Sequence, residues 1–194
     1  VSYNSFNPNT YLEDGQFNEA SVAAGGIKLI KPHTGHVIKI RNASFEVLFT
    51  QEDLYPEKLH FFNDSSMIIR MTIAGQTFMW LGDINIVGSN IVAKMYENYV
   101  KSDMVQVSHH GYIGATKQLY TLISPLVAFW PTSPGEYKNM TSGNNVSVYG
   151  IIDYYVAYRL GVKDNFCAGP NNVSITLPYT AGSNMYEIID IPID

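Results

Sequence analysis

Short apolar runs separated by turn-forming residues dominate the first part of the chain. Runs of this length, bounded by Gly, Pro, Asn and Ser, are typical of β-strands. The two runs around Ala74-Gly75 predict a β-hairpin, and the second is continuously apolar, as expected of a strand buried on both faces. A short helix over 17–24, ended by Gly25-Gly26, is predicted to precede the strands. The predicted strands are 27–30, 37–40, 45–49, 67–73 and 76–81.

The period of the apolar pattern changes in the second part. Val87, Ile91, Met95 and Tyr99 fall four residues apart, which predicts a helix with one apolar face. Helices are also predicted near 117–123 and over 148–160, strands at 104–107, 126–130, 173–177 and 186–191, and a loop over 131–145. This alternation predicts one domain over residues 1–194 of the α/β (α+β) class, a mixed β-sheet with helices packed on one face.

Composition narrows the classes of function. The chain has 194 residues, of which 46% are hydrophobic and 15% charged, so a packed core is expected and disorder is not. A net charge of −5 disfavours a nonspecific polyanion binder, although a bound dication would add positive charge that the count omits. The single cysteine excludes an intrachain disulfide. No apolar run approaches the roughly 18 residues that a membrane-spanning helix needs.

Asp83 stands where a buried strand ends and a helix follows. Ligand sites of α/β sheets form at the carboxyl ends of strands, and Gly82 would let an ion or side chain approach closely. The alternative is that Asp83 only caps the following helix. Local sequence does not choose between the two.

His109 and His110 repeat this arrangement after the predicted strand 104–107. A neutral imidazole at a strand end suits Zn²⁺, Mn²⁺ or Fe, and a second one could orient the first or donate a proton. The alternative is a pair of exposed loop histidines. A right-handed crossover would bring these residues to the same sheet edge as Asp83. One carboxylate and one imidazole are still fewer ligands than a stable metal site needs.

Four segments follow one another in a fixed order along the chain. They begin at Asn63 (Asn-Asp-Ser-Ser-Met-Ile-Ile-Arg), Thr77 (Thr-Phe-Met-Trp-Leu-Gly-Asp), Ser102 (Ser-Asp-Met-Val-Gln-Val-Ser-His-His-Gly) and Pro125 (Pro-Leu-Val-Ala-Phe). This ordered set resembles the metallo-β-lactamase-fold hydrolase superfamily. It most resembles the branch of ComEC-type competence domains and bacterial choline-phosphate esterases.

The resemblance implies roles for individual residues. Asp83 matches an aspartate that bridges two metal ions, and His110 is expected to bind one of them. His109 is expected to act in catalysis, by stabilising developing charge or protonating the leaving group. Asp64, with Asn63 as the alternative, stands where many members place a histidine ligand. The implied cofactor is a divalent metal, zinc by preference, with two ions in the complete fold.

The family's leading His-x-His-x-Asp-His motif does not occur in this sequence. The expectation is therefore the C-terminal half of an αββα metallo-β-lactamase sandwich, with the N-terminal half absent. Since Val1 is not a start-codon residue, we expect a piece of a longer bacterial enzyme.

That enzyme would use a metal-bound hydroxide on a phosphoester-type bond, and this piece would be inactive alone. Its expected partners are the missing N-terminal half, a small-molecule or phosphoester substrate, and further copies of the chain bound through an uncovered sheet face. The alternative is a noncatalytic scaffold or oligomerisation module derived from a hydrolase half.

Overall fold

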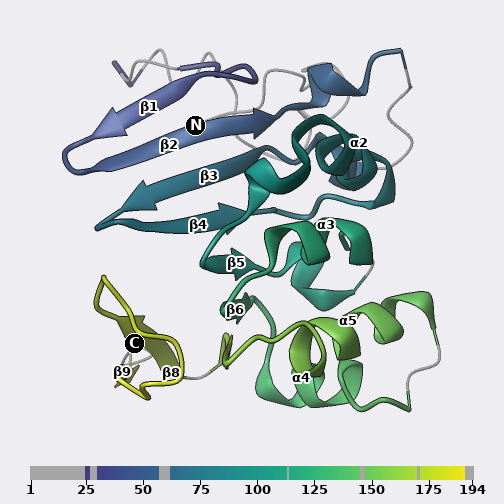
Figure 1. Cartoon of the computed structure of the whole chain (residues 1–194), viewed down its shortest axis with the longest axis vertical. Helices are drawn as coiled ribbons and strands as arrows, with labels where there is room; N and C mark the ends of the chain where they lie inside the picture. The colour runs from purple at the N-terminus through teal and green to yellow at the C-terminus, as the bar shows by residue number, and fades with distance from the viewer. Residues whose placement is uncertain are drawn as a thin grey trace.

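A seven-stranded mixed sheet forms the centre of the protein, in the order β1-β2-β3-β4-β5-β6-β7 (Figure 1). The computed structural model describes residues 25–26, 30–56, 62–112, 114–144, 147–169 and 171–190. The first four strands pair antiparallel, and β4 to β7 pair parallel. The strands are β1 (Val37–Ile40), β2 (Ala43–Phe49), β3 (Ile68–Ile73), β4 (Gln76–Trp80), β5 (Met104–Gln106), β6 (Val127–Trp130) and β7 (Asp164–Cys167).

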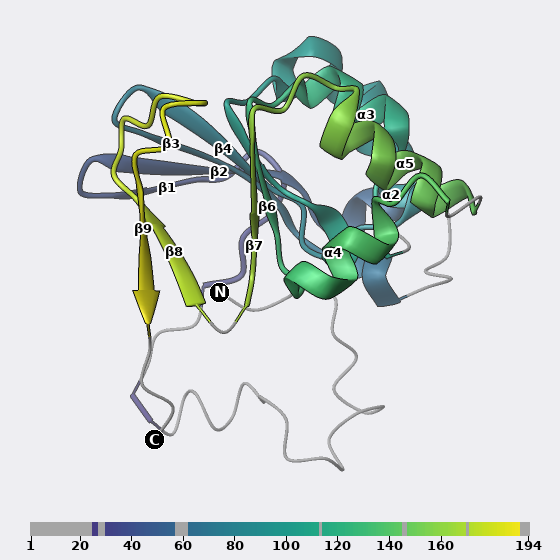
Figure 2. The same ribbon diagram turned by 90° about the horizontal axis from the view of Figure 1, so that it is seen from below.

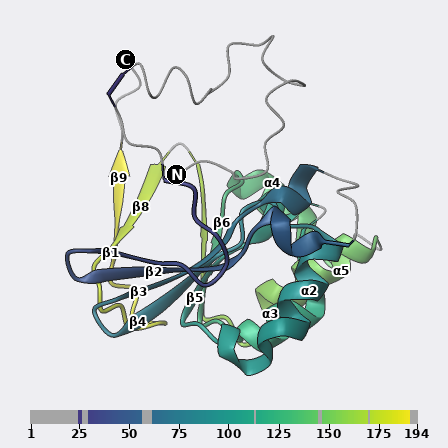
Figure 3. The ribbon, with the colours of Figure 1, turned by 90° about the horizontal axis from the view of Figure 1, so that it is seen from above.

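Within the described ranges, four α-helices pack on one face of this sheet (Figures 2 and 3). They are α2 (Ile86–Tyr96), α3 (Lys117–Ile123), α4 (Pro134–Met140) and α5 (Val148–Tyr158). The larger core lies between the two layers and includes Met79, Val105, Ala128 and Trp130 from the sheet. The α+β class with helices on one face is thereby confirmed.

Short 3-10 helices join several elements: η2 (Gln51–Leu54), η3 (Phe62–Ser65), η4 (Glu97–Val100) and η5 (Ser108–Gly111). η3 carries Asn63 and Asp64, and η5 carries His109 and His110. These two turns therefore hold most of the residues that the sequence singles out as candidate ligands.

The opposite face of the sheet carries a separate two-stranded antiparallel sheet, β8 (Asn171–Ile175) and β9 (Tyr186–Asp190) (Figure 2). A second core of Phe78, Met104, Val127, Phe166 and Tyr179 lies on this face, with apolar residues of β8 packed against it. This face is therefore covered in part, whereas an uncovered face was expected. Trp80 keeps 40% of its surface exposed there.

Two elements were missed. The loop prediction for 131–145 was wrong over Pro134–Met140, where α4 begins at the N-cap Ser133, whose side chain accepts from the amide of Glu136. β7 was not predicted, because Asp164–Cys167 is short and half polar, yet it pairs with β6 along its whole length. The predicted helix 17–24 and most of the predicted strand 27–30 lie outside the described residues.

Candidate functional site

Two turns meet at the carboxyl ends of β4 and β5. The strands run parallel with Trp80 opposite Gln106, so their ends lie side by side. Gly82 and Asp83 follow β4, and η5 with its two histidines follows β5. The amide of His109 donates to the Gly82 carbonyl at 3.0 Å. Gly-Asp and Ser-His-His-Gly are thus brought together, as strand order and crossover predict.

His110 faces Asp83 with an oriented ring. Nε2 of His110 lies 3.8 Å from Oδ1 of Asp83, and the two side chains are 49% and 44% exposed. Nδ1 of His110 lies 2.6 Å from the carbonyl oxygen of Pro131, just beyond β6. A carbonyl can only accept, so Nδ1 carries the proton and Nε2 presents its lone pair towards Asp83. A backbone carbonyl behind the ring is the usual support of a metal-binding histidine.

The separation of these two atoms suits a shared cation better than a direct hydrogen bond. A hydrogen bond would bring nitrogen and oxygen to about 3 Å, well below the observed 3.8 Å. Two ligands at about 2.1 Å from a tetrahedral Zn²⁺ stand about 3.4 Å apart, close to the observed spacing. Imidazole nitrogen and carboxylate oxygen are both zinc ligands. As a donor pair, Asp83 and His110 fit the implied metal.

The pair is not joined by a third ligand in the part of the chain that the structure describes. No group of three or more His, Cys, Asp or Glu side chains gathers there in a metal-binding arrangement. Further ligands would therefore have to come from elsewhere.

Two consecutive residues of η5 have a strained backbone. His109 (φ 48°, ψ 42°) and His110 (φ 59°, ψ 11°) both adopt left-handed conformations. For a residue with a side chain this costs about 1–2 kcal/mol each, and such strain clusters at functional sites. Buried Ser108 anchors the turn, because its amide donates to Tyr120 Oη at 3.0 Å and its hydroxyl to the Ile84 carbonyl at 2.7 Å. The strained turn aims the two rings differently.

The ring of His109 lies beside Asn63 of η3. The Asn63 amide nitrogen is 3.1 Å from Nδ1 and 3.2 Å from Nε2 of His109. The centroids of the His109 and His110 rings are 6.2 Å apart. His109 therefore stands next to the candidate ligands Asp83 and His110.

Asp64 points away from this edge. Its side chain is buried, and Oδ1 accepts from the amides of Asn85 at 3.1 Å and Gly88 at 3.0 Å. The carboxylate thus satisfies the first amides of α2, where it also meets the positive end of the helix dipole. The metal role of Asp64 stays a prediction, and the structure brings the alternative, Asn63, to the histidines instead.

Three further groups shape the site and were not found from the sequence. Ser66 Oγ accepts from the amide of Asp83 at 3.0 Å. Gln106, at the end of β5, hydrogen-bonds backbone groups of Leu81, Gly82 and Val107. The Pro131 carbonyl carries no signal in a sequence, because a backbone group is available at every position. A glutamine at the end of an apolar strand, just before the Ser-His-His run, could have drawn attention.

A buried carboxyl group lies beneath η5. Asp153 of α5 lines a small cavity together with Ser108, Gly114 and Tyr120. It is 5% exposed, and burial raises its pKa to about 8. Burial also raises the pKa of the Tyr120 phenol, which keeps the hydroxyl protonated beside Ser108.

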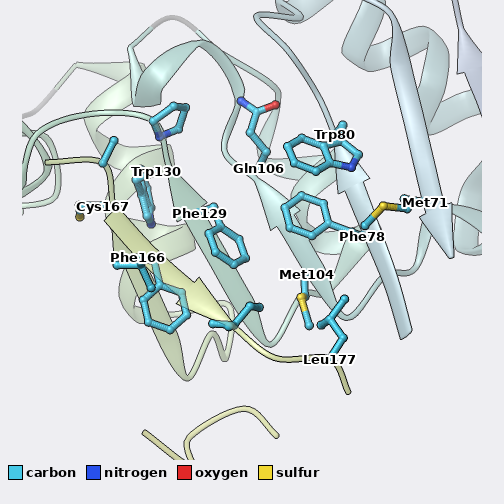
Figure 4. A pocket seen from close by; sticks show the side chains of 14 residues that line it. Met71, Phe78, Trp80, Met104, Gln106, Phe129, Trp130, Phe166, Cys167 and Leu177 are labelled. Atoms are coloured by element: carbon cyan, nitrogen blue, oxygen red, sulfur yellow. The ribbon is translucent and has the colours of Figure 1, made fainter. Parts of the chain in front are cut away.

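An apolar cavity of about 450 Å³ opens on the other sheet face, between the main sheet and β8 (Figure 4). Phe78, Phe129 and Phe166 line it from β4, β6 and β7, and Trp80 stacks on Phe78 with centroids 4.2 Å apart. Gln106 and Pro131 also line it, so the cavity adjoins the edge that carries the histidines.

Comparison with known proteins gives a distant similarity. The chain is 29% identical over 91 residues to ComE operon protein 3 of Bacillus subtilis (strain 168), an alignment that covers 47% of this chain. It spans only 11% of the length of that protein. No family model matches the chain. The similarity to a competence-operon protein is compatible with the branch that the motifs resemble. Among the described helices, none has the length and apolarity needed to cross a membrane.

Proposed function

We propose that this chain is the C-terminal half of a metallo-β-lactamase-fold hydrolase of the ComEC-type branch. The observation that carries the proposal is the oriented His110 ring, whose Nε2 faces Asp83 while Nδ1 is held by the Pro131 carbonyl. An aspartate that only capped a helix and a histidine that only lay in an exposed loop would not need this orientation of the imidazole ring. The similarity to ComE operon protein 3 supports the same branch.

In this proposal Asp83 and His110 hold a divalent metal, zinc by preference. A bound dication of this kind polarises a phosphoryl oxygen and lowers the pKa of a coordinated water towards neutrality. The half-exposed position of both side chains leaves them open to solvent and substrate. The substrate is a phosphoester-type compound, and the net charge of −5 disfavours long polyanions that would have to lie along the surface.

His109 is the residue proposed to act on the substrate. The Asn63 amide contacts the His109 ring. The strained backbone places this ring beside His110 but turns it in a different direction from the His110 ring. With one ring nitrogen accepting from the Asn63 amide, the other can carry a proton, which it donates to the leaving-group oxygen as the ester bond breaks or uses to stabilise negative charge on the phosphoryl oxygens.

The remaining ligands are proposed to come from a preceding half of the same protein. That half would carry the His-x-His-x-Asp-His motif and would pack on the part of the sheet face that stays exposed around Trp80. The described residues offer a pair of ligands and no third, so the chain alone is expected to be inactive.

The test is to express the coding region that precedes Val1 together with this chain and to assay a chromogenic phosphodiester. Activity should require added Zn²⁺ or Mn²⁺, should be lost with EDTA, and should fall at least about a hundredfold in Asp83→Asn and His110→Ala. His36→Ala, in the turn before β1, is the matched control and should keep full activity. Absence of activity in the joined protein, or full activity in Asp83→Asn, would refute the proposal.

A second function is favoured by one observation, the lack of a third ligand among the described residues. In that case the chain is a noncatalytic scaffold or oligomerisation module that keeps a remnant of the site. Inactivity of the joined protein, combined with stable self-association, would support this alternative.

A further inference from the structure

Gln106 ends β5 and lies between the two turns that follow β4 and β5, namely Gly82-Asp83 and η5. Its Oε1 accepts from the amides of Leu81 at 3.1 Å and Gly82 at 2.7 Å. Its Nε2 donates to the carbonyls of Gly82 at 3.2 Å and Val107 at 2.6 Å. One side chain thus makes four hydrogen bonds to backbone groups of both strand ends.

A primary amide is suited to this role, because it offers an acceptor with two lone pairs and two donor hydrogens on one planar group. The groups it binds lie just beyond the last parallel register pair, Trp80 and Gln106, where the ladder of the two strands ends. Left unpaired when partly buried, such groups would destabilise both strand ends.

The bonded groups directly precede the candidate ligands. Gly82 is adjacent to Asp83, and its carbonyl also accepts from the His109 amide. Val107 leads into Ser108 and the two histidines. Any change in how Gln106 holds Gly82 and Val107 therefore changes the distance between Asp83 and His110.

We propose that Gln106 is a positioning residue of the metal site: its amide fixes the separation of the Asp83 and His110 side chains. The inference rests on the proposed function. Ligand-orienting contacts of this kind typically change metal affinity by about 10–100-fold.

The experiment compares Gln106→Met with a matched variant, Gln76→Met. Gln76 lies at the other end of β4, and its amide makes two hydrogen bonds to the Tyr179 backbone, at 2.8 and 2.6 Å. Both variants remove a glutamine amide from the same sheet, and each is expected to lower the melting temperature. Only Gln106 touches the turns of the site.

Two quantities are measured on the full chain: Zn²⁺ affinity by calorimetry, and amide hydrogen exchange at Gly82 and His109. In Gln106→Met we expect Zn²⁺ affinity to fall at least about tenfold and both amides to exchange faster. In Gln76→Met both quantities should stay within about twofold of the wild type.

Unchanged Zn²⁺ affinity in Gln106→Met, or equal losses in the two variants, would overturn the positioning role. If neither this chain nor the protein joined to its preceding half binds Zn²⁺, the proposed function fails. The exchange rates at Gly82 and His109 then decide alone whether Gln106 holds the two turns, and unaltered rates would overturn that as well.

Discussion

Nε2 of His110 lies 3.8 Å from Oδ1 of Asp83, and the other ring nitrogen of His110 is bound to the Pro131 carbonyl. Three neighbouring strands thus contribute to one small site: β4 through Asp83, β5 through His110 and β6 through Pro131. The site therefore depends on the packing of the sheet beneath it.

Asp153 should make stability fall as the pH rises. The pKa of its carboxyl group is about 8 in the folded protein against 3.8 for the free group, because burial disfavours the charged form. Below about pH 4 the carboxyl is neutral in both states, and between about pH 4 and pH 8 the unfolded chain increasingly favours losing the proton. The free energy of unfolding then declines by about 1.4 kcal/mol per unit of pKa difference, several kcal/mol in all.

Asp153→Asn removes this ionisation. Urea unfolding between pH 4 and pH 8 should show the variant gaining stability relative to the wild type as the pH rises. A stability difference that does not change with pH would contradict the raised pKa.

Gly111→Ala should destabilise the His-His turn. Gly111 has φ +87°, and an added Cβ would lie 2.9 Å from Met140 Cε and 3.1 Å from the Trp130 ring. Gly35 is the matched control, since it has the same φ and open space around it. We expect Gly35→Ala to lower the free energy of unfolding by about 1 kcal/mol, and Gly111→Ala by about 1–3 kcal/mol more. Equal losses would show that the packing at Gly111 is not tight.

Asp64 should matter for α2. Asp64→Ala removes the acceptor of the Asn85 and Gly88 amides and should lower the free energy of unfolding by about 1–3 kcal/mol. Asp64→Asn keeps an acceptor oxygen and should recover most of that loss. A fall in Zn²⁺ affinity in Asp64→Asn without loss of stability would instead establish Asp64 as a ligand.

The aromatic face should drive self-association of the isolated chain. Phe78 and Trp80 are stacked, and 40% of the Trp80 surface is exposed beside the apolar cavity. Sedimentation velocity should show a concentration-dependent dimer that Trp80→Lys weakens. Ile151→Lys is the control, because Ile151 is 56% exposed on α5, in the helical layer. A wild-type monomer at all concentrations would contradict this prediction.

The sequence predicted those elements in which the spacing of apolar residues and the capping residue indicate the same structure. α3 has the predicted bounds, and Thr116 caps it through the amide of Leu119. It failed at α4, where Ser133 and Pro134 are a helix start but the Pro, Ser, Gly and Asn content indicates a loop. β8 and β9 were expected, but their separate sheet results from packing on the second core.

The candidate site was predictable as a sheet edge and no further. Strand order places Asp83 and the histidines together, but the left-handed backbone of His109 and His110 decides which ring faces the carboxylate. Asn63 and Asp64 are neighbours, and only the turn of η3 sends one to His109 and the other to α2. These choices are made by tertiary contacts that a local pattern does not encode.

The central claim, that Asp83 and His110 bind one divalent metal, is tested most directly by NMR of the histidine rings during a Zn²⁺ titration. The ring signals of His110 should shift saturably on addition of Zn²⁺. In Asp83→Asn the affinity should fall at least about tenfold. Unshifted His110 signals, or an unchanged titration in Asp83→Asn, would contradict the metal site.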